Sequence, residues 1–199
     1  MTPIPDLEPA ARRMAALLAN VPDHRLGAPT PCADTSLGAL IDHVYGLALA
    51  FTWAAAKDFP DGGSPPPSAD ASALPADWRV RVPERLDALT AAWRSPDAWQ
   101  GMTKAGGIDL PGEAAGRVAM NELVVHGWDI ARTTGQTYDP GQDELDSCLA
   151  FVGPTVDQSG GKGVPGLFGP AVDVPAGAPA LDRLIALTGR TPSWTPPGT

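Results

Sequence analysis

The sequence is poor in several residue types on which protein chemistry depends. Its 199 residues include only 3 histidines and 2 cysteines, so a metal or catalytic site that uses an imidazole or a thiol can involve very few residues. Two cysteines are too few for a disulfide scaffold, which favours a reduced, cytoplasmic protein. Lysine and arginine number 14 against 23 aspartates and glutamates, giving a net charge of −9. Because no basic stripe is present to neutralise phosphates, we expect no nucleic-acid partner.

The sequence also lacks a long apolar run. No stretch approaches the roughly 18 apolar residues that indicate a membrane span, so we expect no membrane partner. Near the N-terminus, Arg12 and Arg13 interrupt the apolar pattern, which does not resemble a secretory signal. Hydrophobic residues make up 43% of the chain, enough for a sizeable core. The length suits one domain over residues 1–199, as a monomer or a homodimer.

Glycine and proline are abundant instead, with 22 and 23 residues. They gather in three stretches that we expect to be loops, namely 58–75, 95–112 and 160–179. Between these stretches apolar residues recur at spacings of three and four, which predicts helices at about 7–21, 36–57, 82–93, 113–134, 144–156 and 181–187. Pro83 either begins the third helix or kinks one that starts near Ala76. Only residues 171–174 suggest a strand, so the pattern predicts an all-α four-helix bundle with long crossover loops and short extra C-terminal helices.

The most informative residues lie on the predicted helix 113–134, within NELVVHGWD. Glu122 and His126 are four residues apart, which places their side chains about 40° apart on one face. Asp129 falls about 20° to the other side of Glu122. Four apolar residues complete this face within about 60° of Glu122: Ala115, Val118, Ala119 and Val125. If the face packs into the bundle, a carboxylate and an imidazole are buried together, which requires a partner or a metal.

A third candidate, His43, lies on the predicted helix that residues 34–36 can cap and that runs to about Lys57. Its neighbours on the same face are small or apolar, which leaves room for a cavity. Two helices of one bundle could therefore present His43 opposite Glu122 and His126. Two imidazoles and one carboxylate suit a catalytic metal site, because three protein ligands leave positions open for water or substrate. Zinc is the leading candidate, with nickel or iron(II) as alternatives.

Each of these residues also has a simpler interpretation. The Glu-x-x-x-His spacing is common on solvated helix faces and in plain Glu–His hydrogen bonds, and a lone His43 could be a core histidine. Asp129 either accepts a hydrogen bond from a metal-bound His126 or pairs with Arg132, three residues further on.

Cys32 and His24 are the remaining reactive residues of interest. Cys32 precedes the predicted helix 36–57 and could be a nucleophile paired with a histidine, or simply a small buried side chain. His24 lies on no predicted core face, so we expect it at the surface.

Four blocks of the sequence resemble a known family: TPC…LIDHV, GMTKAGGIDLPGEAAG, NELVVHGWDIARTTGQ and LDRLIALTGRTPSW. The chain is similar to the DinB/YfiT-like metal-binding superfamily, in the actinobacterial branch related to the N-terminal domain of mycothiol-dependent maleylpyruvate isomerase. The resemblance runs from the first predicted helix to Trp194. It implies a four-helix bundle whose metal is held by a histidine of the second helix and the Glu-x-x-x-His of a later one. The matching residues are His43, Glu122 and His126.

The resemblance implies a thiol-dependent enzyme. Mycothiol or a similar low-molecular-weight thiol would bind a divalent metal and attack a small electrophile, as in a transferase or an isomerase. The alternative is a metal or small-ligand carrier on the same bundle without turnover, and a third interpretation is an inert bundle with structural histidines.

The sequence departs from the family pattern in two places that bear on the reaction. Thr35 stands where the family often has tryptophan, and the isomerase's C-terminal domain has no counterpart here, so the resemblance implies the metal site rather than maleylpyruvate isomerisation itself.

Overall fold

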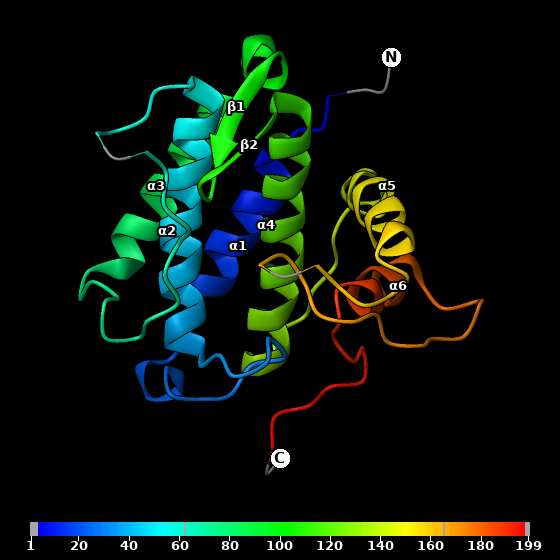
Figure 1. Ribbon diagram of the computed structural model, residues 1–199. Helices are drawn as coiled ribbons and strands as arrows, with labels where there is room; N and C mark the ends of the chain where they lie inside the picture. The colour runs from blue at the N-terminus through cyan, green and yellow to red at the C-terminus, as the bar shows by residue number, and fades with distance from the viewer. Residues whose placement is uncertain (1–3, 62, 165, 198–199) are drawn as a thin grey trace.

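The structure, a computed structural model, describes residues 4–61, 63–164 and 166–197 (Figure 1). Within these ranges the all-α class is confirmed by six α-helices: α1 (Glu8–Ala19), α2 (Leu37–Ala56), α3 (Trp78–Trp93), α4 (Gly112–Thr134), α5 (Gln142–Gln158) and α6 (Ala180–Leu187). Two 3-10 helices, η1 (Asp23–Arg25) and η2 (Pro96–Trp99), and one two-stranded sheet complete the regular structure of the same ranges.

Helices α1 to α4 form the predicted four-helix bundle. α2 packs against α3 and α4, and α1 packs against the same two helices, so the four enclose a common core. α5 packs on α4 outside the bundle and α6 packs on α5, as the yellow and orange helices of Figure 1 show. Most of the largest fully buried side chains come from the bundle helices, among them Met14, Leu18, Leu40, Ile41, Leu86, Leu89, Met120 and Leu123. The contact of α2 with α4, on which the predicted site depends, is therefore part of the main core.

α2 begins where the sequence predicts. Ser36 has an extended backbone, and its Oγ accepts a 3.3 Å hydrogen bond from the backbone N–H of Ala39, which caps the helix. Among the described residues, α2 is the one helix long and apolar enough by composition to cross a membrane. However, 61% of this segment is buried inside the protein, as in the core helix of a soluble bundle, so its composition is weak evidence for a span.

The other bundle helices also lie close to their predicted positions. Pro83 is inside α3, so the helix begins before this proline, which decides between the two alternatives. α4 ends at Thr134, and Gly135 follows with a left-handed φ of 74°, as predicted for the residue after a helix. α4 thus extends without interruption through Glu122, His126 and Asp129.

The prediction that residues 95–112 are only loop is wrong. This segment contains η2 and an antiparallel hairpin of β1 (Met102–Ala105) and β2 (Ile108–Pro111). Gly106 and Gly107 form its two-residue turn with positive φ values of 57° and 81°, the conformation such turns require. The Thr103 hydroxyl donates a 2.6 Å hydrogen bond to the Ala54 carbonyl, which holds the hairpin on α2.

The strand candidate at residues 171–174 is also wrong. This segment is irregular, and the Val172 N–H donates to the Ala186 carbonyl of α6 at 2.9 Å. The preceding loop meets the chain just after α6 through glycine backbones: a Cβ added to Gly189 would lie 2.9 Å from the carbonyl carbon of Gly169. The long C-terminal loop is therefore packed against the tail that leaves α6.

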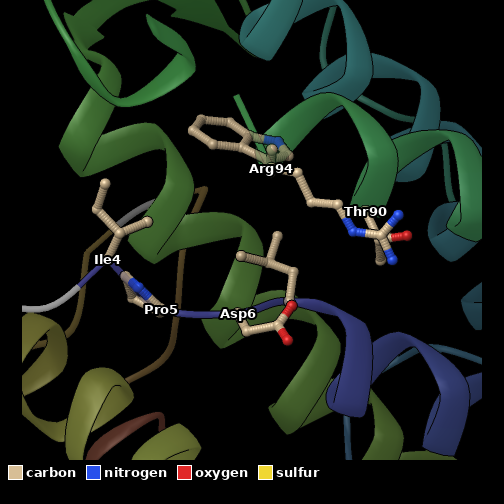
Figure 2. Close-up of a pocket in the computed structure, with 7 residues that line it drawn as sticks. Ile4, Pro5, Asp6, Thr90 and Arg94 are labelled. Atoms are coloured by element: carbon tan, nitrogen blue, oxygen red, sulfur yellow. The ribbon is translucent and has the colours of Figure 1, made fainter. Parts of the chain in front are cut away.

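A small cavity lies between the N-terminal segment and α3 (Figure 2). Its volume is about 160 Å³, and its lining consists of Ile4, Pro5, Asp6, Leu7, Thr90, Trp93 and Arg94. Small-molecule sites usually measure about 300–1,000 Å³. None of the predicted site residues lines this cavity, so the chemistry must be sought between α2 and α4.

Candidate metal centre

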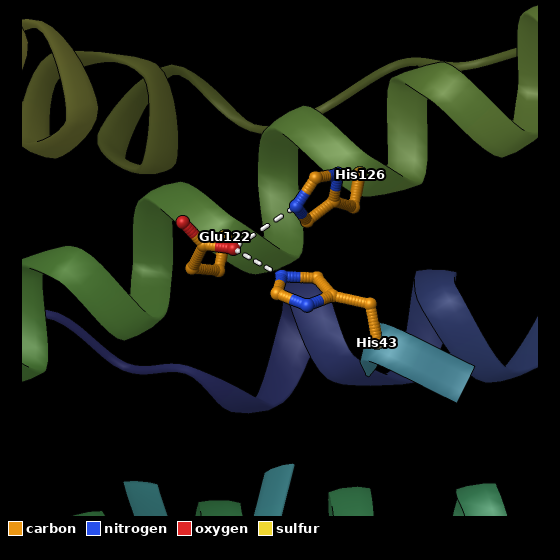
Figure 3. Close-up of side chains that lie close together, drawn as sticks. All are labelled: His43, Glu122 and His126. Carbon is orange, nitrogen blue, oxygen red and sulfur yellow. Dashed lines mark hydrogen bonds and ion pairs between the residues drawn. The ribbon is translucent and has the colours of Figure 1, made fainter. Parts of the chain in front are cut away.

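The three predicted ligands meet between α2 and α4. His43 projects from α2, and Glu122 and His126 project from successive turns of α4 (Figure 3). One donor atom from each of the three lies within 4.8 Å of the other two. The carboxylate is central: Glu122 Oε2 lies 3.0 Å from His126 Nε2 and 3.4 Å from His43 Nε2. The imidazole rings meet edge to face with centroids 5.1 Å apart.

The outer nitrogen of His43 faces the loop 58–75. Its Nδ1 lies 3.3 Å from the carbonyl oxygen of Ser68. A carbonyl only accepts, so Nδ1 carries the proton and donates it. This loop is largely exposed, as predicted, but it is attached beside the site, because Asp42 Oδ2 accepts hydrogen bonds from the Ser68 hydroxyl at 2.6 Å and the Asp70 N–H at 3.1 Å.

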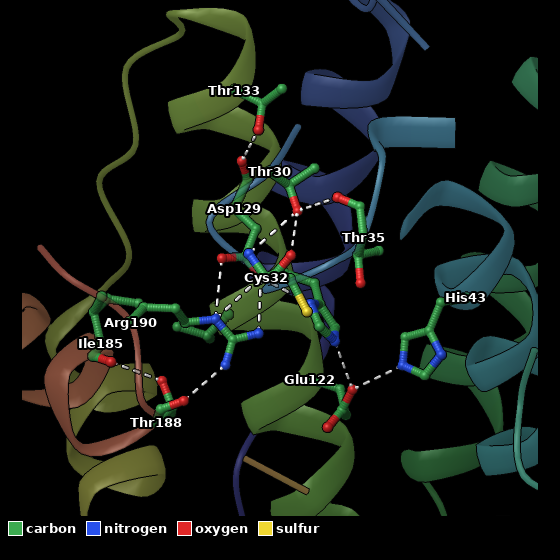
Figure 4. A network of polar contacts seen from close by, with 12 residues as sticks. Thr30, Cys32, Thr35, His43, Glu122, Asp129, Thr133, Ile185, Thr188 and Arg190 are labelled. Atoms are coloured by element: carbon green, nitrogen blue, oxygen red, sulfur yellow. Dashed lines mark hydrogen bonds and ion pairs between the residues drawn. The ribbon is translucent and has the colours of Figure 1, made fainter. Parts of the chain in front are cut away.

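The outer nitrogen of His126 faces a buried carboxylate. Its Nδ1 lies 3.0 Å from Asp129 Oδ2, and the Asp129 side chain is fully buried. Asp129 also receives hydrogen bonds from Nε and Nη2 of Arg190 (Figure 4). The alternative pairing of Asp129 with Arg132 is therefore wrong, since the Arg132 guanidinium donates to the Trp194 carbonyl instead.

The orientation of the two rings leaves both Nε2 atoms directed at the same carboxylate. Each Nδ1 faces an oxygen that accepts, so a neutral ring places its lone pair on Nε2. Both lone pairs would then point at Glu122 Oε2, which also only accepts. A proton on each ring or a shared cation is needed to make these contacts attractive.

The electrostatics of the cluster follow from this crowding of acceptors. Burial alone would lower the pKa of His126, but Glu122 and Asp129 outweigh it and raise the pKa to about 10. Burial would likewise raise the pKa of Glu122, but His126 and His43 hold it well below its ordinary value. For Asp129, Arg190 and His126 overcome burial and lower the pKa of the carboxyl. Both carboxylates therefore carry negative charge and favour a cation at the His126 ring.

The donor set fits a divalent metal. In a tetrahedral site with bonds of about 2.0–2.1 Å, neighbouring donor atoms are about 3.3 Å apart, and the two distances from Glu122 lie on either side of this value. Both histidines also bond an acceptor through their outer nitrogen, as metal-ligating histidines usually do. The side-chain exposures of His43, Glu122 and His126 are 25%, 13% and 9%, so His43 is the most exposed of the three side chains.

Three residues of the hydrogen-bond network around the cluster escaped the sequence-based prediction: Asp42, Ser68 and Arg190. Asp42 directly precedes His43 on an otherwise apolar helix, which was the one available signal. Ser68 contacts His43 through its backbone carbonyl, which no residue type reveals. Arg190 lies in the quoted TGR block, but its distance along the chain from Asp129 conceals the pairing.

The other two reactive residues have no part in the ligand cluster. His24 is exposed, as predicted. Cys32 is half-buried, and among the described residues its hydrogen bonds join its backbone to Thr30 and Thr35, none joining the thiol to a histidine. The structure therefore gives no support to a Cys32–histidine nucleophile pair.

A four-helix bundle with a His–Glu–His cluster between its second and fourth helices defines a protein of the DinB-like class. Residues 7–131 match the family model described as the mycothiol maleylpyruvate isomerase N-terminal domain. The chain belongs to this family.

Similar proteins agree with this assignment. Two uncharacterized proteins of Mycobacterium tuberculosis, from strains CDC 1551 / Oshkosh and ATCC 25618 / H37Rv, are each 31% identical over 207 residues, covering 96% of this chain and 99% of theirs. The crystal structure of the mycothiol-dependent maleylpyruvate isomerase matches with a TM-score of 0.55 at 18% identity, and that of its histidine-to-alanine mutant with 0.57 at 20%. Both matches cover 73% of this chain and 66% of the isomerase chain, and at this identity they establish the fold.

Proposed function

We propose that His43, Glu122 and His126 bind a divalent metal ion, and that the protein is a thiol-dependent transferase or isomerase. The convergence of both Nε2 atoms on Glu122 Oε2 carries this proposal, because a shared cation satisfies all three donors at once. A metal bound there supplies a Lewis acid, which lowers the pKa of a thiol bound to it. Three protein ligands leave at least one position for that thiol.

The residues around the donors have defined tasks in this proposal. The Ser68 carbonyl and the Asp129 carboxylate keep the protons of His43 and His126 on Nδ1, so that each Nε2 is free to bind. Glu122 contributes negative charge between the rings. The larger exposure of His43 leaves an approach for a small molecule, whereas Asp129 lies on the closed side.

Zinc is the metal that we propose first. Two imidazoles and one carboxylate form an open catalytic zinc site in other enzymes, and zinc requires no particular geometry beyond what three donors provide. The same donors bind nickel and iron(II), so the choice must come from measurement.

The thiol and the second substrate are proposed from family membership. The similar crystal structures are those of a mycothiol-dependent isomerase, which supports mycothiol or a related low-molecular-weight thiol as the cofactor. The second substrate is then a small electrophile that accepts the thiolate. We do not extend the proposal to maleylpyruvate, because the chain spans only 66% of the isomerase's length.

Metal analysis of the purified full chain tests the first half of the proposal. Wild type should hold about one equivalent of metal, and His126→Ala and Glu122→Gln should lose it while remaining folded. His24→Ala is the matched control, because His24 is exposed and outside the cluster. Equal, low metal content in wild type and His126→Ala would contradict metal binding.

Turnover tests the second half. The metal-loaded protein is incubated with mycothiol and a panel of small electrophiles, and consumption of the free thiol is followed. Metal-dependent consumption that is lost in His126→Ala supports an enzyme. A loaded protein that consumes no thiol over a broad panel is instead a metal or ligand carrier.

A further inference from the structure

Arg190 reaches the candidate metal centre from outside the family domain. The family match covers residues 7–131, whereas Arg190 lies after α6, 61 residues beyond Asp129 in sequence. Its side chain is nevertheless buried, with an exposure of 9%, and the side chain of its partner Asp129 is 0% exposed. A buried arginine beside a buried carboxylate is costly unless both are closely paired, so the contact is a specific feature of the fold.

The arginine holds the carboxylate at two points. Arg190 Nε donates to Asp129 Oδ1 at 3.1 Å, and Nη2 donates to Oδ2 at 2.9 Å. This two-point arrangement fixes the plane of the carboxylate as well as its position. Asp129 Oδ2 is also the atom that accepts the hydrogen bond from His126 Nδ1.

The position of Arg190 is itself determined by the backbone around it. Nη1 donates to the Thr188 carbonyl at 3.0 Å. The preceding Gly189 has a φ of 83° and lies against Gly169, too close for a side chain. The guanidinium is therefore held before any ligand arrives, with the C-terminal loop and the tail as its support.

We propose that Arg190 is a positioning residue of the metal centre, which fixes the orientation of His126 through Asp129. Held by Arg190, the Asp129 carboxylate keeps the His126 proton on Nδ1 and directs Nε2 toward Glu122. The metal centre thus depends on residues of the C-terminal segment that the family domain does not include. This inference rests on the proposed metal site, and it adds a residue to which that proposal assigns no role.

Metal affinity and metal spectroscopy of the full chain test the inference. Arg190→Met removes the donors, Arg190→Lys retains the charge without the two-point contact, and Arg132→Met is the matched control. Arg132 also binds the tail, through the Trp194 carbonyl, but does not contact Asp129. Zinc affinity is measured by competition with a chelator, coordination geometry by the visible absorption of the cobalt(II) protein, and folding by circular dichroism and thermal melting.

We expect Arg190→Met to bind zinc about 10–100-fold more weakly than wild type, as is typical when an outer contact of a ligand is lost. Its cobalt spectrum should change, Arg190→Lys should be intermediate, and Arg132→Met should match wild type. If Arg190→Met does not fold, Arg190→Lys decides the outcome.

Two results would overturn the inference while leaving the proposed function intact. One is wild-type zinc affinity and cobalt spectra in every folded Arg190 variant. The other is equal weakening in Arg132→Met, which would show that only a loosened tail is responsible. Failure of wild type to bind any metal would instead overturn the proposed function, and this inference with it.

Discussion

The hydroxyl of Ser68 donates a 2.6 Å hydrogen bond to the carboxylate of Asp42, the residue directly before His43. The same carboxylate oxygen accepts from the Asp70 N–H. Together these contacts place the Ser68 carbonyl beside Nδ1 of His43. A loop remote in sequence from α4 therefore contacts the outer nitrogen of His43, as Asp129 contacts that of His126.

Loss of this attachment should weaken metal binding. Ser68→Ala removes the hydroxyl but retains the backbone carbonyl, so the loop should separate from α2 more often. We expect zinc affinity to fall by up to about 10-fold and hydrogen exchange at the Asp70 amide to accelerate. Ser72→Ala is the control, because the Ser72 hydroxyl bonds Asp70 within the same loop and does not reach α2. Identical exchange and affinity in the two variants would contradict the role of Ser68.

The two cysteines should differ strongly in reactivity. Cys148 is fully buried, and burial raises the pKa of its thiol well above the ordinary value, so little reactive thiolate forms. Cys32 is half-buried and should react first with a chromogenic disulfide reagent at pH 8. We expect one fast thiol per native chain and two after denaturation. Cys32→Ser should abolish the fast phase, and a fast phase that persists in this variant would show that Cys148 is accessible.

The ion pair between Arg13 and Glu144 should stabilise the attachment of α5. Both carboxylate oxygens of Glu144 accept from Arg13, at 2.9 and 3.0 Å, and the Glu144 side chain is only 6% exposed. Breaking a buried pair costs about 3–5 kcal/mol of stability. We expect a loss near the lower end of this range for Arg13→Met, which leaves the hydrogen bond from the Gly141 N–H to Glu144 in place, because Arg13 is itself partly exposed.

Chemical denaturation measures this loss of stability. Glu113→Ala breaks the exposed pair with Arg117 on α4 and serves as the control, with an expected change of no more than about 1 kcal/mol. Similar losses in the two variants would show that burial adds nothing to the Arg13–Glu144 pair.

Gly116 should tolerate no side chain. A Cβ there would lie 2.4 Å from Trp99 Cζ3 and 2.8 Å from Trp93 Cζ3. Gly116→Ala should therefore destabilise the protein by about 1–3 kcal/mol through overpacking. In the double variant with Trp99→Leu, the new methyl group has space, so the combined loss should be smaller than the sum of the single losses. Strict additivity in thermal or chemical unfolding would refute this close contact.

Much of the fold could be predicted because its determinants are local. The apolar spacing of α4 and the glycine after Thr134 fixed that helix almost to the residue. The same periodicity placed Glu122 and His126 on one apolar face and His43 on another, and the structure brings the three together. Whether they bind a metal stays a prediction.

The hairpin and the partner of Asp129 could not be predicted in the same way, because they depend on tertiary contacts that the spacing of residues in the sequence does not indicate. Strands of four residues are too short to show alternation, so the hairpin was missed although Gly106-Gly107 is a favourable turn. Asp129 and Arg132 are close in sequence, and their pairing was a reasonable expectation. Tertiary packing instead brings in Arg190 from far along the chain.

The unequal burial of the two histidines would have a kinetic consequence in the proposed metal site. His126 is buried and hydrogen-bonded to Asp129, whereas the His43 side chain is 25% exposed and contacts the Ser68 carbonyl of a surface loop. An ion that departs would be released first by His43 and last by His126. The lifetime of the bound ion would then follow the opening rate of the loop, even where its equilibrium affinity is governed by the opposite side of the site.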